Sequence, residues 1–163
     1  MENRVQIVDD PDQYNQLIRK MVPTESTGAH VYAKVYVHPE AKVVTESKIY
    51  VNKTDFVLNG EDYTDLIPVV VRHEVAELYV YAKRGYSTTP IPVSMSPEGA
   101  RKIAHGLAVR EQIRYAKEIG KIDRYMEYVR KLSVTMPGNE GVKFCEENDD
   151  AYDKVMKENT VIK

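Results

Sequence analysis

The sequence predicts an α+β domain in which a small antiparallel sheet of two to three strands is followed by about four helices. Apolar and polar residues alternate between positions 29 and 51, as in strands, while later runs have the spacing of helices. The length of 163 residues is that of one ordinary domain, which can bury a core without disulfides. We therefore expect a single core, with the sheet first and the helices after it.

The strands are expected in the first third of the chain. A short helix precedes them, opening near residue 10 and ending before Pro23. From Ala29 to Val37 the alternation is strict, which indicates a strand with one buried face. A second strand fits Glu46 to Val51, and Asn59-Gly60 marks a turn that leads to the first long helix.

Helices are expected in the remainder of the domain. The first covers about 65–84 and is apolar on nearly every side, so we expect it to be buried all round, with Pro68 tolerated in its first turn. The second covers about 97–119, with Ser96 as its N-cap, and the last reaches Leu132. The domain is predicted to span 1–138.

The last segment, 139–163, is polar and contains an acidic run from Glu146 to Asp150. We expect it to be an acidic C-terminal tail or docking arm with only one short helix, around Tyr152 to Met156. Its composition lacks the apolar periodicity of the preceding helices.

Composition excludes several functional classes. A net charge of −2, from 23 basic and 25 acidic residues, gives no excess of positive charge for nucleic acid. No stretch reaches the roughly 18 apolar residues of a membrane span. The single Cys145 forms no internal disulfide, and the first residues do not resemble a signal peptide. We expect a cytoplasmic protein that binds neither membranes nor nucleic acid; the sequence does not indicate its oligomeric state.

Three ionisable residues, His73, Glu74 and Glu77, lie within the apolar helix. A buried carboxylate without a partner costs several kcal/mol, so these side chains require one. His73 and Glu77 are one turn apart and separated by only about 40° around the helix axis, so both can reach one point. This spacing is suited to chelating a metal ion.

A second ligand is available on the following helix, where small residues surround His105 in the run Ala104-His105-Gly106-Leu107-Ala108. Small neighbours allow another helix to approach closely. Two imidazoles and one carboxylate suit catalytic zinc, with a fourth position for water, and also suit non-haem iron. The candidate metal ligands are therefore His73, Glu77 and His105.

The run His73-Glu74-Val75-Ala76-Glu77 resembles a variant of the zincin metallopeptidase motif, in which one helix carries His-Glu-x-x-His. In the gluzincin branch a later helix supplies a glutamate as third ligand. Here Glu77 occupies the position of the second histidine, and His105 that of the later glutamate. The resemblance covers about residues 29 to 120 and includes the order of a minimal zincin, a small sheet followed by two ligand-bearing helices.

The resemblance implies a metal-dependent hydrolase, a zincin-like peptidase that acts on a protein or peptide substrate. It implies one zinc ion, with iron the less favoured metal. Glu74 is the implied catalytic base, which would deprotonate water held by the metal for attack on a peptide carbonyl. Glu111, about one and a half helical turns beyond His105, is the competing carboxylate; because it points to a different face of the second helix, it is expected in the shell around the ligands and not among them.

Two alternatives remain open from the residues alone. The trio could form a buried ion-pair network with Arg72, Arg101 or Arg110, in a non-catalytic protein-interaction module of the same fold. A helical carboxylate and histidine site could instead hold iron for redox chemistry, with Glu74 as a ligand. Metal content separates the first alternative from the hydrolase, and spectroscopy of the metal form separates the second.

Overall fold

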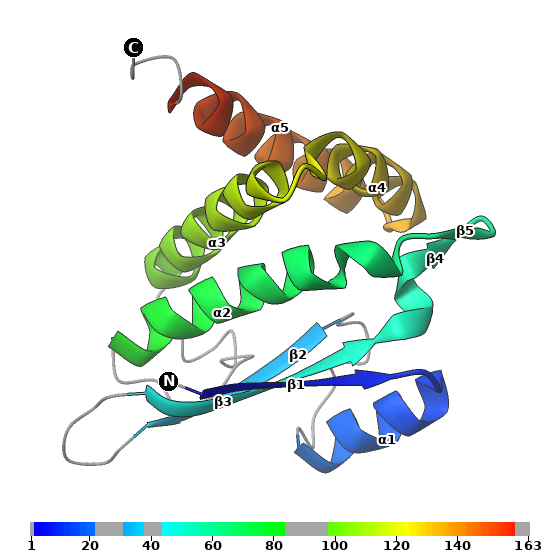
Figure 1. Cartoon of the computed structure of the whole chain (residues 1–163), viewed down its shortest axis with the longest axis vertical. Coiled ribbons are helices and arrows are strands. Elements are labelled where there is room, and N and C mark those ends of the chain that lie inside the picture. The colour runs from blue at the N-terminus through cyan, green and yellow to red at the C-terminus, as the bar shows by residue number, and fades with distance from the viewer. Residues whose placement is uncertain (1, 22–30, 38–43, 84–97, 159–163) are drawn as a thin grey trace.

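The computed structural model describes residues 2–21, 31–37, 44–83 and 98–158. Figure 1 shows these residues as successive layers. Helix α1 lies on one face of a small sheet, helix α2 lies on the other, and helices α3, α4 and α5 pack beyond α2. This arrangement confirms the predicted α+β class and places α2 between the sheet and the other helices.

The main sheet has three strands in the order β1-β3-β2. Strands β2 (Val31–Val37) and β3 (Val44–Asn52) are antiparallel and confirm the two predicted strands. Strand β1 (Glu2–Val8), which the sequence did not predict, pairs with β3 in parallel. Its segment contains too few alternating apolar residues to predict a strand. The edge strand is identified only by its hydrogen-bonded pairing with β3.

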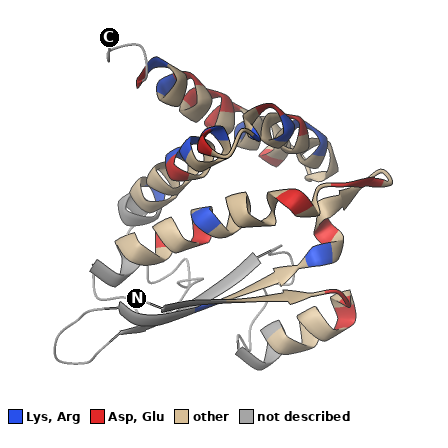
Figure 2. Cartoon of the chain, in the orientation of Figure 1, with Lys and Arg blue, Asp and Glu red and all other residues tan. Residues whose placement is uncertain are grey.

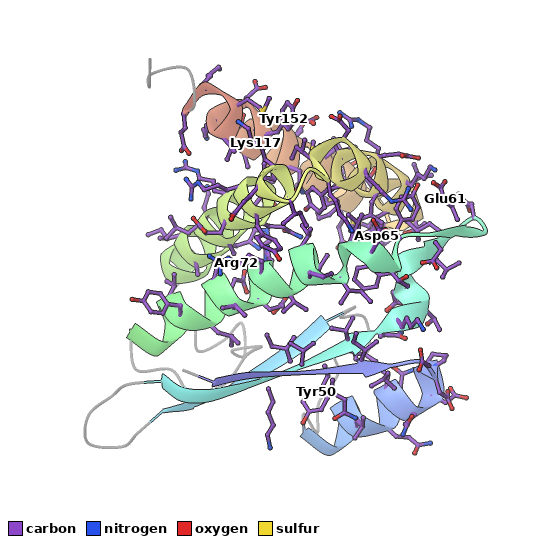
Figure 3. The ribbon with its side chains drawn as sticks, in the orientation of Figure 1. Tyr50, Glu61, Asp65, Arg72, Lys117 and Tyr152 are labelled. Atoms are coloured by element: carbon purple, nitrogen blue, oxygen red, sulfur yellow. The ribbon has the colours of Figure 1, made fainter. Side chains whose placement is uncertain are left out.

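The two faces of β3 contribute to different clusters. Ile49 and Val51 are fully buried in the main core, on the side that α2 covers. Tyr50 points to the opposite face (Figure 3), where it packs against a small cluster formed by Val8 and Tyr14. Tyr14 comes from α1 (Pro11–Met21), the predicted first helix, whose first turn is capped by the carboxylate of Asp10.

A short hairpin connects the sheet to α2. After a single 3-10 turn at Lys53–Phe56, strands β4 (Val57–Leu58) and β5 (Glu61–Asp62) pair across Asn59 and Gly60. Both turn residues have positive φ, 52° and 81°, as two-residue hairpins require. The predicted turn is confirmed, and a second 3-10 turn at Thr64–Leu66 leads from it into α2.

Helix α2 (Ile67–Lys83) begins two residues later than predicted and carries Pro68 in its first turn. Val69 and Leu78 are fully buried, but Arg72 and Tyr79 are exposed. The expectation of burial all round was therefore wrong. The sheet and α3 pack against α2 and cover it only in part.

Two further helices confirm the prediction. Helix α3 (Glu98–Glu118) packs along α2, and α4 (Ile122–Thr135) follows after Gly120, whose φ of 70° ends α3. Ser96, the predicted cap of α3, lies outside the described residues. Among the helices of the described ranges, none is long and apolar enough to cross a membrane.

The expectation of only one short helix, around Tyr152 to Met156, was wrong, because residues Glu140–Glu158 form a 19-residue helix, α5, that packs on α3 and α4. One face of α5 is buried; its members are Gly141, Asn148, Ala151 and Val155. The amide oxygen of Asn148 accepts a hydrogen bond of 2.8 Å from the buried Tyr125 hydroxyl of α4. The small buried face and the hydrogen bond of Asn148 therefore hold α5 against the domain, although the composition of this segment is typical of a polar tail.

Gly141 sets how closely α5 approaches α4. A Cβ at this position would lie 2.0 Å from the backbone oxygen of Ser133. Only glycine permits this contact without a shift of one helix. Figure 2 shows acidic and basic residues interspersed along α3, α4 and α5 in this view.

Candidate metal centre

The three predicted ligands meet between α2 and α3. A carboxylate oxygen of Glu77 lies 3.4 Å from Nε2 of His73 and 3.0 Å from Nδ1 of His105. The two imidazole rings are 5.0 Å apart between centroids, in an edge-to-face arrangement. One ligand atom from each residue lies within 4.8 Å of the others. Glu77 and His73 come from one turn of α2, as their spacing predicted.

The second nitrogen of each ring faces an acceptor. Nδ1 of His73 lies 3.0 Å from the amide oxygen of Gln112, a buried residue of α3. Nε2 of His105 lies 3.1 Å from a carboxylate oxygen of Glu147 on α5. Because these oxygens only accept, each ring nitrogen facing them must donate. This leaves Nε2 of His73 and Nδ1 of His105 directed at Glu77.

We refer to His73, Glu77, His105, Gln112 and Glu147 as the histidine cluster. It has the two shells of protein metal sites, in which a ligating imidazole donates its other N–H to a carboxylate or carbonyl oxygen. Zinc bonds of about 2.0–2.2 Å place neighbouring tetrahedral ligands about 3.3 Å apart. The two distances from Glu77 to the imidazoles are close to that spacing. The residues present therefore fit a divalent ion with two imidazoles and one carboxylate.

Electrostatics in the cluster favour a negatively charged Glu77. Burial alone would raise the pKa of its carboxyl group, but hydrogen bonds from His105 and His73 and their positive charge outweigh burial and lower this pKa to about 2. The hydrogen bond with Glu77 in turn raises the pKa of His105, despite partial burial. The contacts with Glu77 and Glu147 therefore favour the protonated form of His105.

Glu74 has a different environment from Glu77. Loss of hydration raises its pKa to about 7, an effect reinforced by the charge of Glu77 and opposed by that of His73 and His105. Its side chain is partly buried, and no hydrogen bond or ion pair joins it to the other described residues. The predicted base thus lies beside the cluster without being a member of it, and it changes protonation near neutral pH.

The arginines considered as partners of the trio do not neutralise it. Arg72 lies on the side of α2 that faces α3 (Figure 3) and pairs with Glu111 at 3.6 Å. Across the described ranges no ion pair joins Arg110 to the trio, and the side chain of Arg101 lies outside them. Glu111 also pairs with Arg114, and its expected place in the shell around the metal ligands stays a prediction.

Two members of the cluster were missed from sequence. Gln112 follows His105 by seven residues, two helical turns, and this spacing could have placed it on the same side of α3. Glu147 carried no such signal, because it lies in the segment predicted to be a tail. Its contribution depends on the docking of α5.

The order of elements from the sheet to α3 agrees with the order on which the resemblance to a minimal zincin was based. The likeness itself remains a prediction. Comparison with known proteins adds no relative: no family model, no curated protein and no solved structure matches this chain.

Proposed function

We propose that this protein is a metal-dependent hydrolase that binds one zinc ion through His73, Glu77 and His105 and cleaves a protein or peptide substrate. One observation carries the proposal: three ligand atoms lie within 4.8 Å of one another, and an oxygen acceptor faces the remaining nitrogen of each imidazole. Such acceptors fix which nitrogen remains for a metal.

The chemistry assigned to the chain's own residues rests on Glu74. A bound divalent ion supplies Lewis-acid activation of water and of a substrate carbonyl. Glu74, with a pKa raised to about 7, is suited to accept a proton from the attacking water and to return it to the leaving amine. The neighbouring Glu77, with its pKa near 2, stays ionised and cannot exchange protons in this way.

The first experiment is elemental analysis of the protein purified without a histidine tag and without added metal. We expect about one equivalent of zinc, and loss of this metal from His73→Ala and His105→Ala. Because the same ligand set suits iron, an equivalent of iron would support the redox alternative. Absence of binding even after titration with zinc would contradict the proposal.

Activity is tested separately, with a library of fluorogenic peptides as the probe. Glu74→Gln should retain zinc but lose hydrolysis, because an amide cannot accept the proton. Glu118→Gln, an exposed acidic position near the end of α3, is the matched control and should leave both properties unchanged. Equal turnover by wild type and Glu74→Gln would remove Glu74 from the role of base.

A second candidate function is a non-catalytic interaction module with a structural charge network. It is favoured by the completeness of the metal-free cluster, in which His105 bridges Glu77 and Glu147 and none of the buried polar side-chain atoms in the described ranges lacks a partner. Under this alternative, zinc neither binds at micromolar concentration nor raises the melting temperature. The metal titration therefore decides between the two functions.

A further inference from the structure

The histidine cluster joins three helices, although its three candidate ligands come from only two. The ring of His105 on α3 lies between Glu77 of α2 and Glu147 of α5, at 3.0 and 3.1 Å. The side chain of Glu147 is 54% exposed, whereas those of Glu77 and His73 are 16% and 13% exposed. The C-terminal helix therefore reaches the centre from its solvent side, through one carboxylate.

The two imidazoles are oriented by different kinds of acceptor. His73 faces the neutral amide of Gln112, which is buried on α3 beside it. His105 faces a carboxylate group that belongs to a separate helix. A carboxylate that accepts the outer N–H of a ligating imidazole fixes the tautomer and orientation of the ring and increases its basicity. Only the position of α5 provides this for His105.

We propose that Glu147 is a positioning residue for the metal centre, and that metal binding and docking of α5 are coupled through it. This inference rests on the proposed metal binding by His73, Glu77 and His105. With Glu147 in place, Nε2 of His105 carries the proton and Nδ1 faces the metal position. Without it, the part-exposed ring can turn or bind through its other nitrogen.

The packing of α5 fixes the position of Glu147 and so links docking of this helix to the metal centre. Asn148, next to Glu147 in sequence, is anchored by the Tyr125 hydroxyl at 2.8 Å. Near the end of α5, Glu158 accepts a hydrogen bond of 2.9 Å from Arg114 of α3. These contacts hold Glu147 in place along α3. By linkage, any factor that Glu147 adds to metal affinity is also the factor by which the metal favours docked α5.

The affinity test is a zinc titration in competition with a chromogenic chelator. We expect Glu147→Ala to bind zinc about 10–100-fold more weakly than wild type. Glu147→Gln should recover part of this loss, because its amide keeps an acceptor oxygen. The control is Glu146→Ala, which removes the same charge from the adjacent exposed position and should bind zinc as wild type does. Cobalt absorption bands, which report coordination geometry, should change in Glu147→Ala only.

The coupling test is amide hydrogen exchange along α5. Zinc should slow exchange of α5 amides in wild type, and in Glu147→Ala this additional protection should fall by about the same factor as the affinity. If wild type binds zinc but Glu147→Ala has the same affinity and cobalt spectrum, the inference is wrong and the proposed function stands. If wild type binds no zinc, both are wrong.

Discussion

Two clusters of charged side chains among the described residues differ in the cations that contact their carboxylates. The hairpin cluster joins the β4–β5 hairpin to α4; its members are Glu61, Tyr63, Arg124, Glu127 and Lys131. Lys131 donates to Glu61, to Glu127 at 2.7 Å and to the Tyr63 hydroxyl at 2.6 Å. Every carboxylate there meets a permanent cation. In the histidine cluster the carboxylates meet only imidazoles and no lysine or arginine of the described residues.

This difference shows in the pKa values of the acids. Hydrogen bonds from Lys131 lower the pKa of both Glu61 and Glu127 in the hairpin cluster, at the molecular surface. Beside the histidine cluster, burial raises the pKa of Glu74 to about 7. The hairpin cluster is complete without an added ion. The histidine cluster could gain a cation by protonation of His105 or, under the proposed function, by binding a metal, and this is the property expected of a functional site.

The largest expected effect is on metal binding by Glu77→Gln. Glu77 contacts both imidazoles, so its neutral amide should weaken zinc binding by more than the roughly 100-fold upper range of an outer-shell change. Glu127→Gln, the same change in the hairpin cluster, should leave zinc affinity unaltered. Isothermal titration with zinc measures both variants. Equal losses would show that the two clusters do not differ in the way described.

The second effect is on the free energy of unfolding. Replacing Glu74, beside the histidine cluster, and Glu61, in the hairpin cluster, should change it in opposite directions. The folded-state pKa of Glu74 is raised, so its ionisation destabilises the metal-free protein progressively from about pH 4.5 to 7. Glu74→Gln should therefore increase the free energy of unfolding above pH 7, by on the order of 2–3 kcal/mol. This gain should vanish below pH 4.5. Urea unfolding with a chelator present, at several pH values, measures it.

Glu61→Gln is the counterpart in the hairpin cluster. Its folded-state pKa is lowered, so its contribution is present above the unfolded value near 4.5 and is lost as pH falls through the lower folded value. The substitution should destabilise slightly at neutral pH, because exposed ion pairs contribute little. A stabilising Glu61→Gln, or a destabilising Glu74→Gln above pH 7, would contradict the assigned environments.

A smaller change tests whether α5 belongs to the folded domain, as the histidine cluster requires. Asn148→Leu removes the acceptor of the buried Tyr125 hydroxyl and should cost about 1–3 kcal/mol. Asp153→Ala, at an exposed position of the same helix, should change stability by less than about 0.5 kcal/mol. Chemical denaturation of both variants gives the comparison. No loss in Asn148→Leu would mean that α5 is not docked as described.

The smallest effect concerns salt. Lys131→Ala removes the central cation of the hairpin cluster, and its destabilisation should shrink between about 0.1 and 1 M salt, as the screening length falls from roughly 10 to 3 Å. The His73→Ala effect on the part-buried histidine cluster should be less sensitive to salt. Melting temperatures at the two salt concentrations test this. Equal sensitivity would indicate that both clusters are equally solvated.

Sequence reasoning located the part of the site that depends on one helix and its neighbour. The spacing of His73 and Glu77 fixed their common direction. Ala104 and Ala108, on either side of His105, are buried, whereas Gly106 is exposed and nothing lies within 4 Å of a Cβ built at its position. The hairpin turn at Asn59-Gly60 and the ends of the helices were also within reach, since glycine and proline mark them. These features depend on local geometry, which the sequence specifies directly.

The features that were missed depend on packing between distant segments. Helix α5 has a narrow buried face within an acidic segment, so its sequence lacks a clear helical spacing of apolar residues. Its docking shows only in the structure, where Asn148 accepts a hydrogen bond from Tyr125. Glu147 becomes a partner of His105 only once that helix is docked. The pairing of Arg72 with Glu111 likewise could not be chosen over a pairing with Glu74 or Glu77 without the relative position of α2 and α3.

The parallel pairing of β1 with β3 has a consequence for the order of folding. It places Glu2 beside Glu46, so β1 can add to the sheet only after the chain between them has closed a long loop, whereas β2 and β3 are neighbours along the chain. Loop closure must precede the gain from such distant contacts, which makes them slow to form. The β2–β3 pair is therefore expected to form before β1 joins the sheet. The candidate metal centre also requires a long loop to close, because Glu147 lies 42 residues after His105 along the chain.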